Sequence, residues 1–274
     1  MARGSGDAVA PAIASRGPLS RSEVALLGCA GLLAFFGLWA LASLSGLTSR
    51  QFLPPPWTVA AKFVELTYEP FSGYTLQQHL LSSFARFGMG FALAALVGVP
   101  LGLLLGWFRW LDAIFSPLFD ALRFVAPIAW VPFAALWFGT GIGGPVLIIF
   151  TGAFPPCVIN AHRGARYVDR RLVEAAQTLG ARNWRIISEV LLPASVPSIV
   201  AGLRVSAGLG WQSLVGAELI VASSGIGYVL VKGQASISTS IVMSGMIAIG
   251  LVGFAIDVLL RRLEARLQRG RTHD

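Results

Sequence analysis

Charge is scarce in this chain. Of its 274 residues only 12% are charged, whereas 55% are hydrophobic and the mean hydropathy is +0.71. A soluble domain carries about 25% charged residues. So few charges would leave the apolar surface of a water-soluble chain uncovered, so we expect lipid to be the solvent for much of it.

Lysine and cysteine are also rare. Lys62 and Lys232 are the two lysines among the 21 Lys and Arg residues that give a net charge of +8. A basic balance can indicate nucleic-acid binding, but these arginines flank apolar segments, so we expect no nucleic-acid partner. Cys29 and Cys157 both lie in apolar stretches, which argues against a disulfide framework and favours two small buried side chains.

The motifs of enzymes and nucleotide-binding proteins are missing. Neither lysine follows a glycine, so the chain has no Gly-x4-Gly-Lys-Ser/Thr phosphate loop. It also contains no HExxH, GxSxG or clustered Cys/His pattern. We therefore expect no catalytic residue, no metal site and no cofactor on this chain.

Long apolar runs are what the chain does contain. Spanning a bilayer takes about 20 such residues, and six segments qualify: Ala25 to Leu47, Ser83 to Phe108, Ile114 to Phe138, Pro145 to Ala161, Ile199 to Ala222 and Ile237 to Leu260. We predict an all-α integral membrane protein of about six transmembrane helices. A cleaved signal peptide is the alternative for the first segment, but its length exceeds the usual apolar core of about 7–15 residues, so we interpret it as retained.

The distribution of arginine predicts the orientation. With the N-terminus inside, the outer segments hold only Arg50, Lys62 and Lys232, and most other cations fall inside. Both termini are then cytoplasmic in a multi-pass protein of the cell inner membrane. The predicted divisions are cytoplasmic tails over residues 1–22 and 263–274 and a transmembrane domain over 23–262, which includes a cytoplasmic loop over 162–198.

Three local patterns refine this picture. Trp57 to Leu66, in the longest outer loop, is typical of a short amphipathic helix that either contacts a partner or, as we favour, lies among lipid headgroups. Gly98, Gly102 and Gly106 recur every fourth residue, which predicts close helix packing. Prolines inside the third and fourth apolar segments predict kinks, so these segments are candidates for lining a path.

The polar loop over residues 162–198 separates the fourth and fifth spans. We predict a helix from Leu172 to Leu179 closed by Gly180 in a positive-φ conformation, and then a second helix from Arg182 to Leu191 that stops at Pro193. Asn183 is a candidate cap of the second helix. The basic face of this loop suits either anionic headgroups or the docking of another protein.

Seven residues of this loop carry a family resemblance. Glu174-Ala175-Ala176, Gly180, Val190 and Leu192-Pro193 resemble the EAA loop of binding-protein-dependent ABC importer permeases, with Val190 in place of isoleucine. Residues 121–141, 202–220 and 223–233 are similar to the subgroup that imports taurine, alkanesulfonates, nitrate and related anions. Val125-Ala126 departs from that subgroup, which more often has another proline there. The resemblance covers about residues 52–268.

The resemblance implies a set of partners. A second copy of the chain would complete a homodimer in the lipid bilayer, and two separate ATPase subunits would hold ATP and Mg. A periplasmic substrate-binding protein would deliver the substrate. The seven residues named above would form a coupling-helix loop that engages an ATPase, and the permease would alternate between inward-facing and outward-facing states.

Charges inside the apolar segments are costly and are candidates for the translocation path. Asp120 and Arg123 lie one helical turn apart, so both an internal ion pair and a role in the path stay open. Arg123 would suit an anion. Glu218 lacks a local partner and is expected to pair with a cation on another helix. Trp130 and Trp211 are further candidates, although packing or an interfacial belt is the commoner role.

Two alternatives remain beside an anion importer. One is the same architecture importing a thiamine-precursor-like heterocycle. The other is a stand-alone membrane channel or enzyme. A stand-alone protein has no use for a docking loop, and the missing catalytic motifs weigh against an enzyme.

Overall fold

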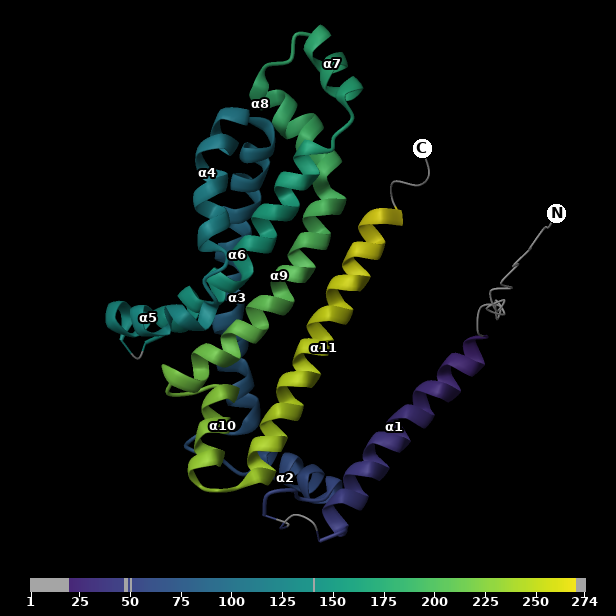
Figure 1. Cartoon of the computed structure of the whole chain (residues 1–274), viewed down its shortest axis with the longest axis vertical. Coiled ribbons are helices and arrows are strands. Elements are labelled where there is room, and N and C mark those ends of the chain that lie inside the picture. The colour runs from purple at the N-terminus through teal and green to yellow at the C-terminus, as the bar shows by residue number, and fades with distance from the viewer. Residues whose placement is uncertain (1–19, 47–48, 50, 140, 270–274) are drawn as a thin grey trace, which may run out of the picture. The chain divides into compact units, whose positions relative to one another are not determined.

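The structure is a computed structural model that describes residues 20–46, 49, 51–139 and 141–269 (Figure 1). Within these residues the chain is helical, with one isolated bridge between Phe71 and Tyr74 and no strand. It divides into two compact units, residues 1–56 and 57–274, which are described separately. The predicted all-α class is confirmed.

The first unit contains helix α1 (Arg21–Leu44). Ser20 and Glu23 form a reciprocal capping box, in which Ser20 Oγ accepts from Glu23 N at 3.2 Å and the Glu23 carboxylate accepts from Ser20 N at 2.7 Å. At the other end, Trp39 Nε1 donates to Pro54 O at 3.1 Å. The first predicted span therefore forms a membrane-length helix.

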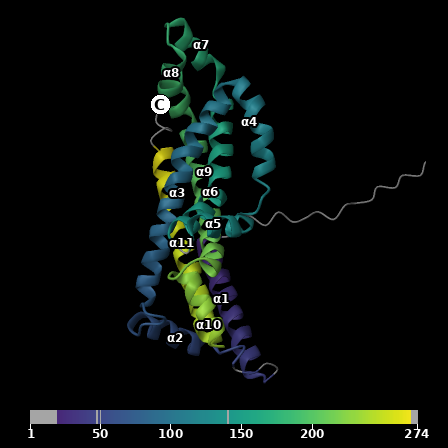
Figure 2. The ribbon, with the colours of Figure 1, turned by 90° about the vertical axis from the view of Figure 1, so that its left-hand side faces the viewer.

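Three long helices form the centre of the second unit. These are α3 (Leu76–Trp107), α6 (Gly143–Arg166) and α9 (Leu192–Ile220), which lie side by side in Figures 1 and 2. Gly98, Gly102 and Gly106 of α3 all face α6, and a Cβ on any of them would overlap atoms of α6. The predicted close packing is confirmed, because only glycine lets the two backbones approach this far. Helices α10 (Ile226–Ala235) and α11 (Thr239–Arg269) pack beside α9.

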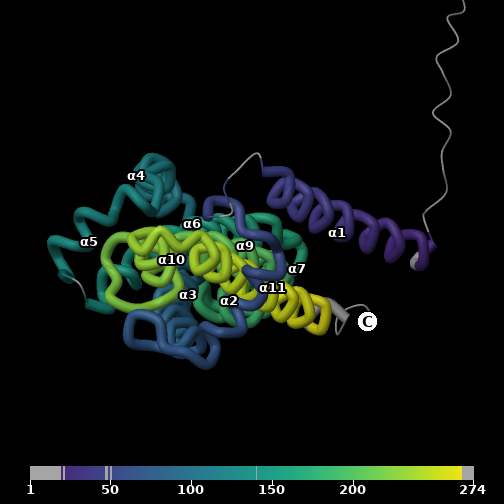
Figure 3. Tube along the Cα trace, turned by 90° about the horizontal axis from the view of Figure 1, so that it is seen from below, coloured from purple at the N-terminus to yellow at the C-terminus, as the bar shows by residue number. Residues whose placement is uncertain are grey.

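The third predicted span is broken. Helix α4 (Arg109–Leu122) and the following pair, η1 (Pro127–Trp130) and α5 (Val131–Phe138), meet at 87° (Figures 1 and 3). The described residues thus contain five helices long and apolar enough to cross a membrane, or six if this bent pair counts as one span. The kink predicted for the segment from Ile114 to Phe138 is confirmed, and it is a full break, because Pro127 removes a backbone donor and restricts Ala126 to an extended conformation.

Two short helices also differ from expectation. Helix α2 (Pro56–Tyr68) lies beside α11 (Figure 3). It buries Val59 and Leu66, and Ser244 Oγ of α11 donates to Val59 O at 3.2 Å. One face of this helix therefore packs on the bundle, which the sequence did not predict, and its predicted location among headgroups stays a prediction. Helix α10 was not predicted at all, because its ten residues are too short to register as a span.

The loop between α6 and α9 contains α7 (Arg170–Thr178) and α8 (Asn183–Ile186). Gly180 has φ +79°, as predicted, and its N–H donates to Gln177 O at 2.9 Å. The predicted cap at Asn183 was wrong, because the capping position is Arg182 and no side chain caps it. The predicted stop at Pro193 was also wrong. A π-helical turn (Ile187–Leu191) joins α8 to α9, and Pro193 lies at the start of α9, where proline is tolerated.

Candidate functional site

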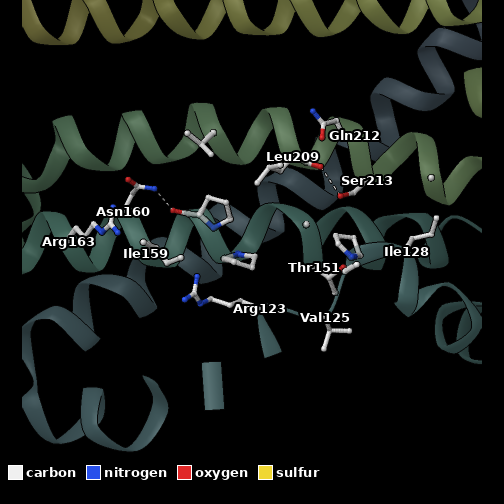
Figure 4. Close-up of a pocket in the computed structure, with 17 residues that line it drawn as sticks. Arg123, Val125, Ile128, Thr151, Ile159, Asn160, Arg163, Leu209, Gln212 and Ser213 are labelled. Carbon is white, nitrogen blue, oxygen red and sulfur yellow. Dashed lines mark hydrogen bonds between the residues drawn. The ribbon is translucent and has the colours of Figure 1, made fainter. Parts of the chain in front are cut away.

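A cavity of about 640 Å³ opens between the bend that follows α4, helix α6 and helix α9 (Figure 4). Its apolar wall comes mostly from the prolines and aliphatic side chains of these elements. Its polar lining residues are Arg123, Thr151, Asn160, Arg163, Gln212 and Ser213. A cavity of this size matches small-molecule sites, which measure about 300–1,000 Å³.

The sequence of α6 shapes one wall of this cavity. Pro155 and Pro156 cannot donate to the carbonyls four residues earlier, those of Thr151 and Gly152, and all four residues line the cavity. Asn160 Nδ2 donates to Pro156 O at 2.9 Å, whereas the freed carbonyls of Thr151 and Gly152 belong to residues that line the cavity (Figure 4). Proline is tolerated inside a membrane helix where a cavity or a side chain satisfies the freed groups. The expected role of this segment in lining a path therefore fits the geometry.

Two arginines give the cavity a positive potential. Arg123 and Arg163 line both this cavity and an adjoining one of about 220 Å³. Arg123 Nε donates to Asp120 Oδ1 at 2.8 Å, so the predicted pair forms, with both side chains partly exposed. Arg163 has no ion-pair partner in the part of the chain that the structure describes. Because Asp120 balances the charge of Arg123, the uncompensated positive charge of this cavity is that of Arg163.

Sequence reasoning missed Arg163 as a lining residue. It was assigned to the cytoplasmic loop because the apolar run ends at Ala161, whereas α6 continues to Arg166. The signal was present in the spacing. Pro156, Asn160 and Arg163 are separated by four and three residues, so they share one helix face.

The structure does not bring the other three predicted path residues to this cavity. Glu218 is 1% exposed and accepts from Arg86 Nη1, which confirms that it pairs with a cation on another helix. Trp211 is buried against Phe87. Trp130 packs edge-to-face on Phe133. These contacts are typical of packing, so the candidate path narrows to Arg123 with its partner Asp120 and to the newly found Arg163.

The seven residues of the EAA-like pattern gather at one end of the bundle (Figure 1). Glu174, Ala175 and Ala176 lie on α7, Gly180 lies in the turn, Val190 lies in the π-helical turn, and Leu192 and Pro193 begin α9. None of the residues of α7 is buried. An amphipathic helix left this exposed presents a surface to a partner.

Membrane-length helices, a cavity lined by two arginines beside a broken span and an exposed helix at one end define a subunit of a membrane transport system. Residues 98–271 match the family described as the inner membrane component of binding-protein-dependent transport systems. The chain belongs to this family, the permease subunits of ABC importers. It is accordingly a multi-pass membrane permease and not an enzyme, and its partners are an ATPase and a substrate-binding protein.

Several curated relatives support this assignment. The taurine transport system permease TauC of Escherichia coli K12 is 34% identical over 92% of this chain and 91% of its own length. The putative aliphatic sulfonates permease SsuC of Bacillus subtilis 168 is 37% identical over 85% and 83%. The bicarbonate permease CmpB of Synechococcus elongatus is 34% identical over 89% and 88%.

A solved structure shares the fold. An inward-facing form of the MetNI methionine ABC transporter has a chain that aligns with a TM-score of 0.60 at 17% identity, covering 70% of this chain and 95% of that one. This likeness confirms the predicted fold, and the family match over residues 98–271 confirms the predicted family. The alternatives of a stand-alone channel or an enzyme are set aside.

Proposed function

We propose that this permease forms the path for a small anion such as taurine, a sulfonate, nitrate or a related organic anion. The observation that carries the proposal is that Arg123, at the end of α4, and Arg163, on α6, line the same cavity. Guanidinium groups match the oxygens of sulfonates and carboxylates with two parallel hydrogen bonds. The relatives named for taurine, aliphatic sulfonates and bicarbonate support the same class of substrate.

The lining also favours an anion over a thiamine-precursor-like heterocycle. None of the described residues along the cavity is aromatic. A flat heterocycle gains much of its binding energy from stacking on aromatic rings, so this wall offers it little. The polar side chains of Thr151, Asn160 and Gln212 instead offer hydrogen bonds at one edge of a small polar solute.

The proposed assembly follows from the family and from the exposed α7. Two identical copies pair in the inner membrane with both termini cytoplasmic. The loop over residues 174–193 of each copy engages one of two ATPase subunits, which hold ATP and Mg, so this chain needs no cofactor. A periplasmic binding protein delivers the anion to the outer face. Closure of the ATPase pair then moves the permease between its two access states.

Uptake by proteoliposomes tests this proposal. The chain is reconstituted with its ATPase and its binding protein, and uptake of labelled taurine, an alkanesulfonate and nitrate is measured. Arg123→Gln and Arg163→Gln should each lower the uptake kcat/KM roughly 10–100-fold, as expected for the loss of a charged hydrogen bond worth about 1.5–3 kcal/mol. Arg262→Gln, which removes an exposed charge far along α11, is the matched control. Unchanged anion uptake in both test variants would refute the proposal that this cavity is part of the translocation path.

A further inference from the structure

A second cavity, of about 590 Å³, lies where α3 and α6 end and α7 begins. Its lining includes Trp107, Arg109, Arg166, Arg170, Glu174 and Gln177. Trp107 and Arg166 are the last residues of two membrane-length helices. The cavity therefore lies at the ends of two membrane-length helices, and one of its lining residues is a tryptophan, the residue enriched where hydrocarbon gives way to lipid headgroups.

Three arginines from three elements surround this cavity. Arg109 begins α4, Arg166 ends α6 and Arg170 begins α7. Arg166 is paired, because its Nη1 donates to Asp112 Oδ2 at 2.9 Å. Arg109 and Arg170 have no ion-pair partner in the described residues.

Two carboxylates complete the charges around the site. Glu174 also lines the cavity, and Asp169 caps α7 by accepting from Arg171 N at 3.0 Å. Asp169 does not line the cavity, so the lining holds three arginines and one carboxylate, Glu174. Arg166 is neutralised by Asp112, and the two remaining arginines outnumber Glu174. Like charges held around one space repel each other, so an anion placed between them lowers the energy of the cluster.

We propose that this cavity binds a phosphate group between Arg109 and Arg170, supplied either by the headgroup of an anionic phospholipid or by free phosphate. The planar forks of two guanidinium groups suit phosphate oxygens, and Gln177 supplies a further donor from α7. A basic pocket at the cytoplasmic ends of membrane helices is a common place for such headgroups. The site rests on the proposed orientation, which puts this end of the bundle in the cytoplasm.

The bound phosphate has a mechanical role. No residue of α7 is buried, so few contacts of its own hold this helix against the bundle. A phosphate that bridges Arg170 on α7 to Arg109 on α4 fixes the angle at which α7 faces the ATPase. Anionic lipid or phosphate then tunes how strongly the two subunits are coupled.

Lipid binding to the full-length chain in nanodiscs tests the site. The chain is placed in phosphatidylcholine with increasing phosphatidylglycerol, and retained phosphatidylglycerol is counted by native mass spectrometry. The double variant Arg109→Gln, Arg170→Gln should bind it roughly 30-fold more weakly, since each arginine near the membrane surface contributes about fivefold. The control Arg171→Gln removes the same charge from the same helix but does not line the cavity, and it should bind like the parent.

A second arm separates the two sources of phosphate. Millimolar inorganic phosphate is added to nanodiscs of phosphatidylcholine alone, and the thermal unfolding midpoint is measured. If phosphate raises the unfolding midpoint of the parent but not of the double variant, free phosphate is the ligand. If instead the double variant retains less phosphatidylglycerol than the parent and phosphate has no effect, the ligand is the lipid headgroup. Arg109→Lys with Arg170→Lys keeps both charges and should retain partial binding, which guards against a folding defect in the glutamine pair.

Two results would overturn the site. One is equal retention of phosphatidylglycerol by parent, double variant and control, together with no effect of phosphate. The other is that Arg109 and Arg170 become protected from an arginine-directed label only when the ATPase is added, which would make this cavity part of the interface with the ATPase. Neither measurement uses substrate, so failure here is distinct from failure of the transport proposal.

Discussion

Arg86 of α3 donates from Nη1 to Glu218 Oε1 of α9 at 2.8 Å, across 132 residues of sequence. The same guanidinium donates to the carbonyl and to the hydroxyl of Ser224, both at 2.6 Å. Glu218 also accepts from Ser83 Oγ at 2.8 Å and from Gly227 N at 3.0 Å. One buried ion pair thus fastens two long helices to the turn that leads into α10.

Removing one charge of this pair should destabilise the permease. Glu218→Gln leaves the Arg86 charge buried without a counter-charge, at a cost of about 3–5 kcal/mol, and the unfolding midpoint in detergent should fall accordingly. The control is Glu65→Gln, which breaks the exposed pair with Lys62 and should cost less than about 1 kcal/mol. Similar midpoints for the two variants would show that the buried pair does not hold the fold. Arg86→Met with Glu218→Leu should recover much of the loss.

Gly180 should be required for coupling because of its conformation alone. A Cβ at this position meets nothing within 4 Å, but φ is +79°, where an L side chain costs about 1–2 kcal/mol. Gly180→Ala should therefore lower hydrolysis stimulated by the binding protein several-fold, while basal hydrolysis by the assembled complex persists. Gly208→Ala, equally open but inside α9, should leave coupling unchanged. If the binding protein stimulates hydrolysis equally in both variants, the turn at Gly180 has no part in coupling.

Close packing of α3 on α6 predicts a sharp contrast between two glycines of one helix. A Cβ at Gly102 would overlap the Val158 carbonyl, so Gly102→Ala should cost about 1–3 kcal/mol through overpacking. Gly88, also on α3, has nothing within 4 Å. Gly88→Ala should be neutral or stabilising by up to about 1 kcal/mol, because alanine favours helix. Thermal unfolding compares the two, and a neutral Gly102→Ala would contradict the packing.

Cysteine labelling tests the proposed orientation. In a background with Cys29 and Cys157 replaced by serine, new cysteines are placed at two exposed positions, Glu69 after α2 and Thr178 at the end of α7. An impermeant maleimide should label Glu69→Cys in intact spheroplasts and label Thr178→Cys only after lysis. The reverse pattern would invert the topology deduced from arginine placement.

Local patterns were enough to predict some features and not others. The glycine stripe of α3 is set by helical spacing alone, so it could be read directly. An average of hydropathy over a window contains no information on the angle between two helical segments. It could therefore not predict the 87° bend, although Pro127 indicated where the helix breaks. Arg163 was missed because a helix continues through polar residues beyond the apolar run. The partner of Glu218 lies too far along the chain for any local pattern to indicate it.

The absence of a stop at Pro193 has a consequence for force transmission. Residues Asn183–Ile220 form one continuous run of 38 helical residues, which spans about 57 Å at 1.5 Å per residue. The hydrocarbon core measures about 30 Å, so close to half of this rod extends beyond it. We expect a push on the protruding part to be carried along this helix into the bilayer. The wall of the cavity between α6 and α9, built partly from Leu209 and Gln212, would then move with it.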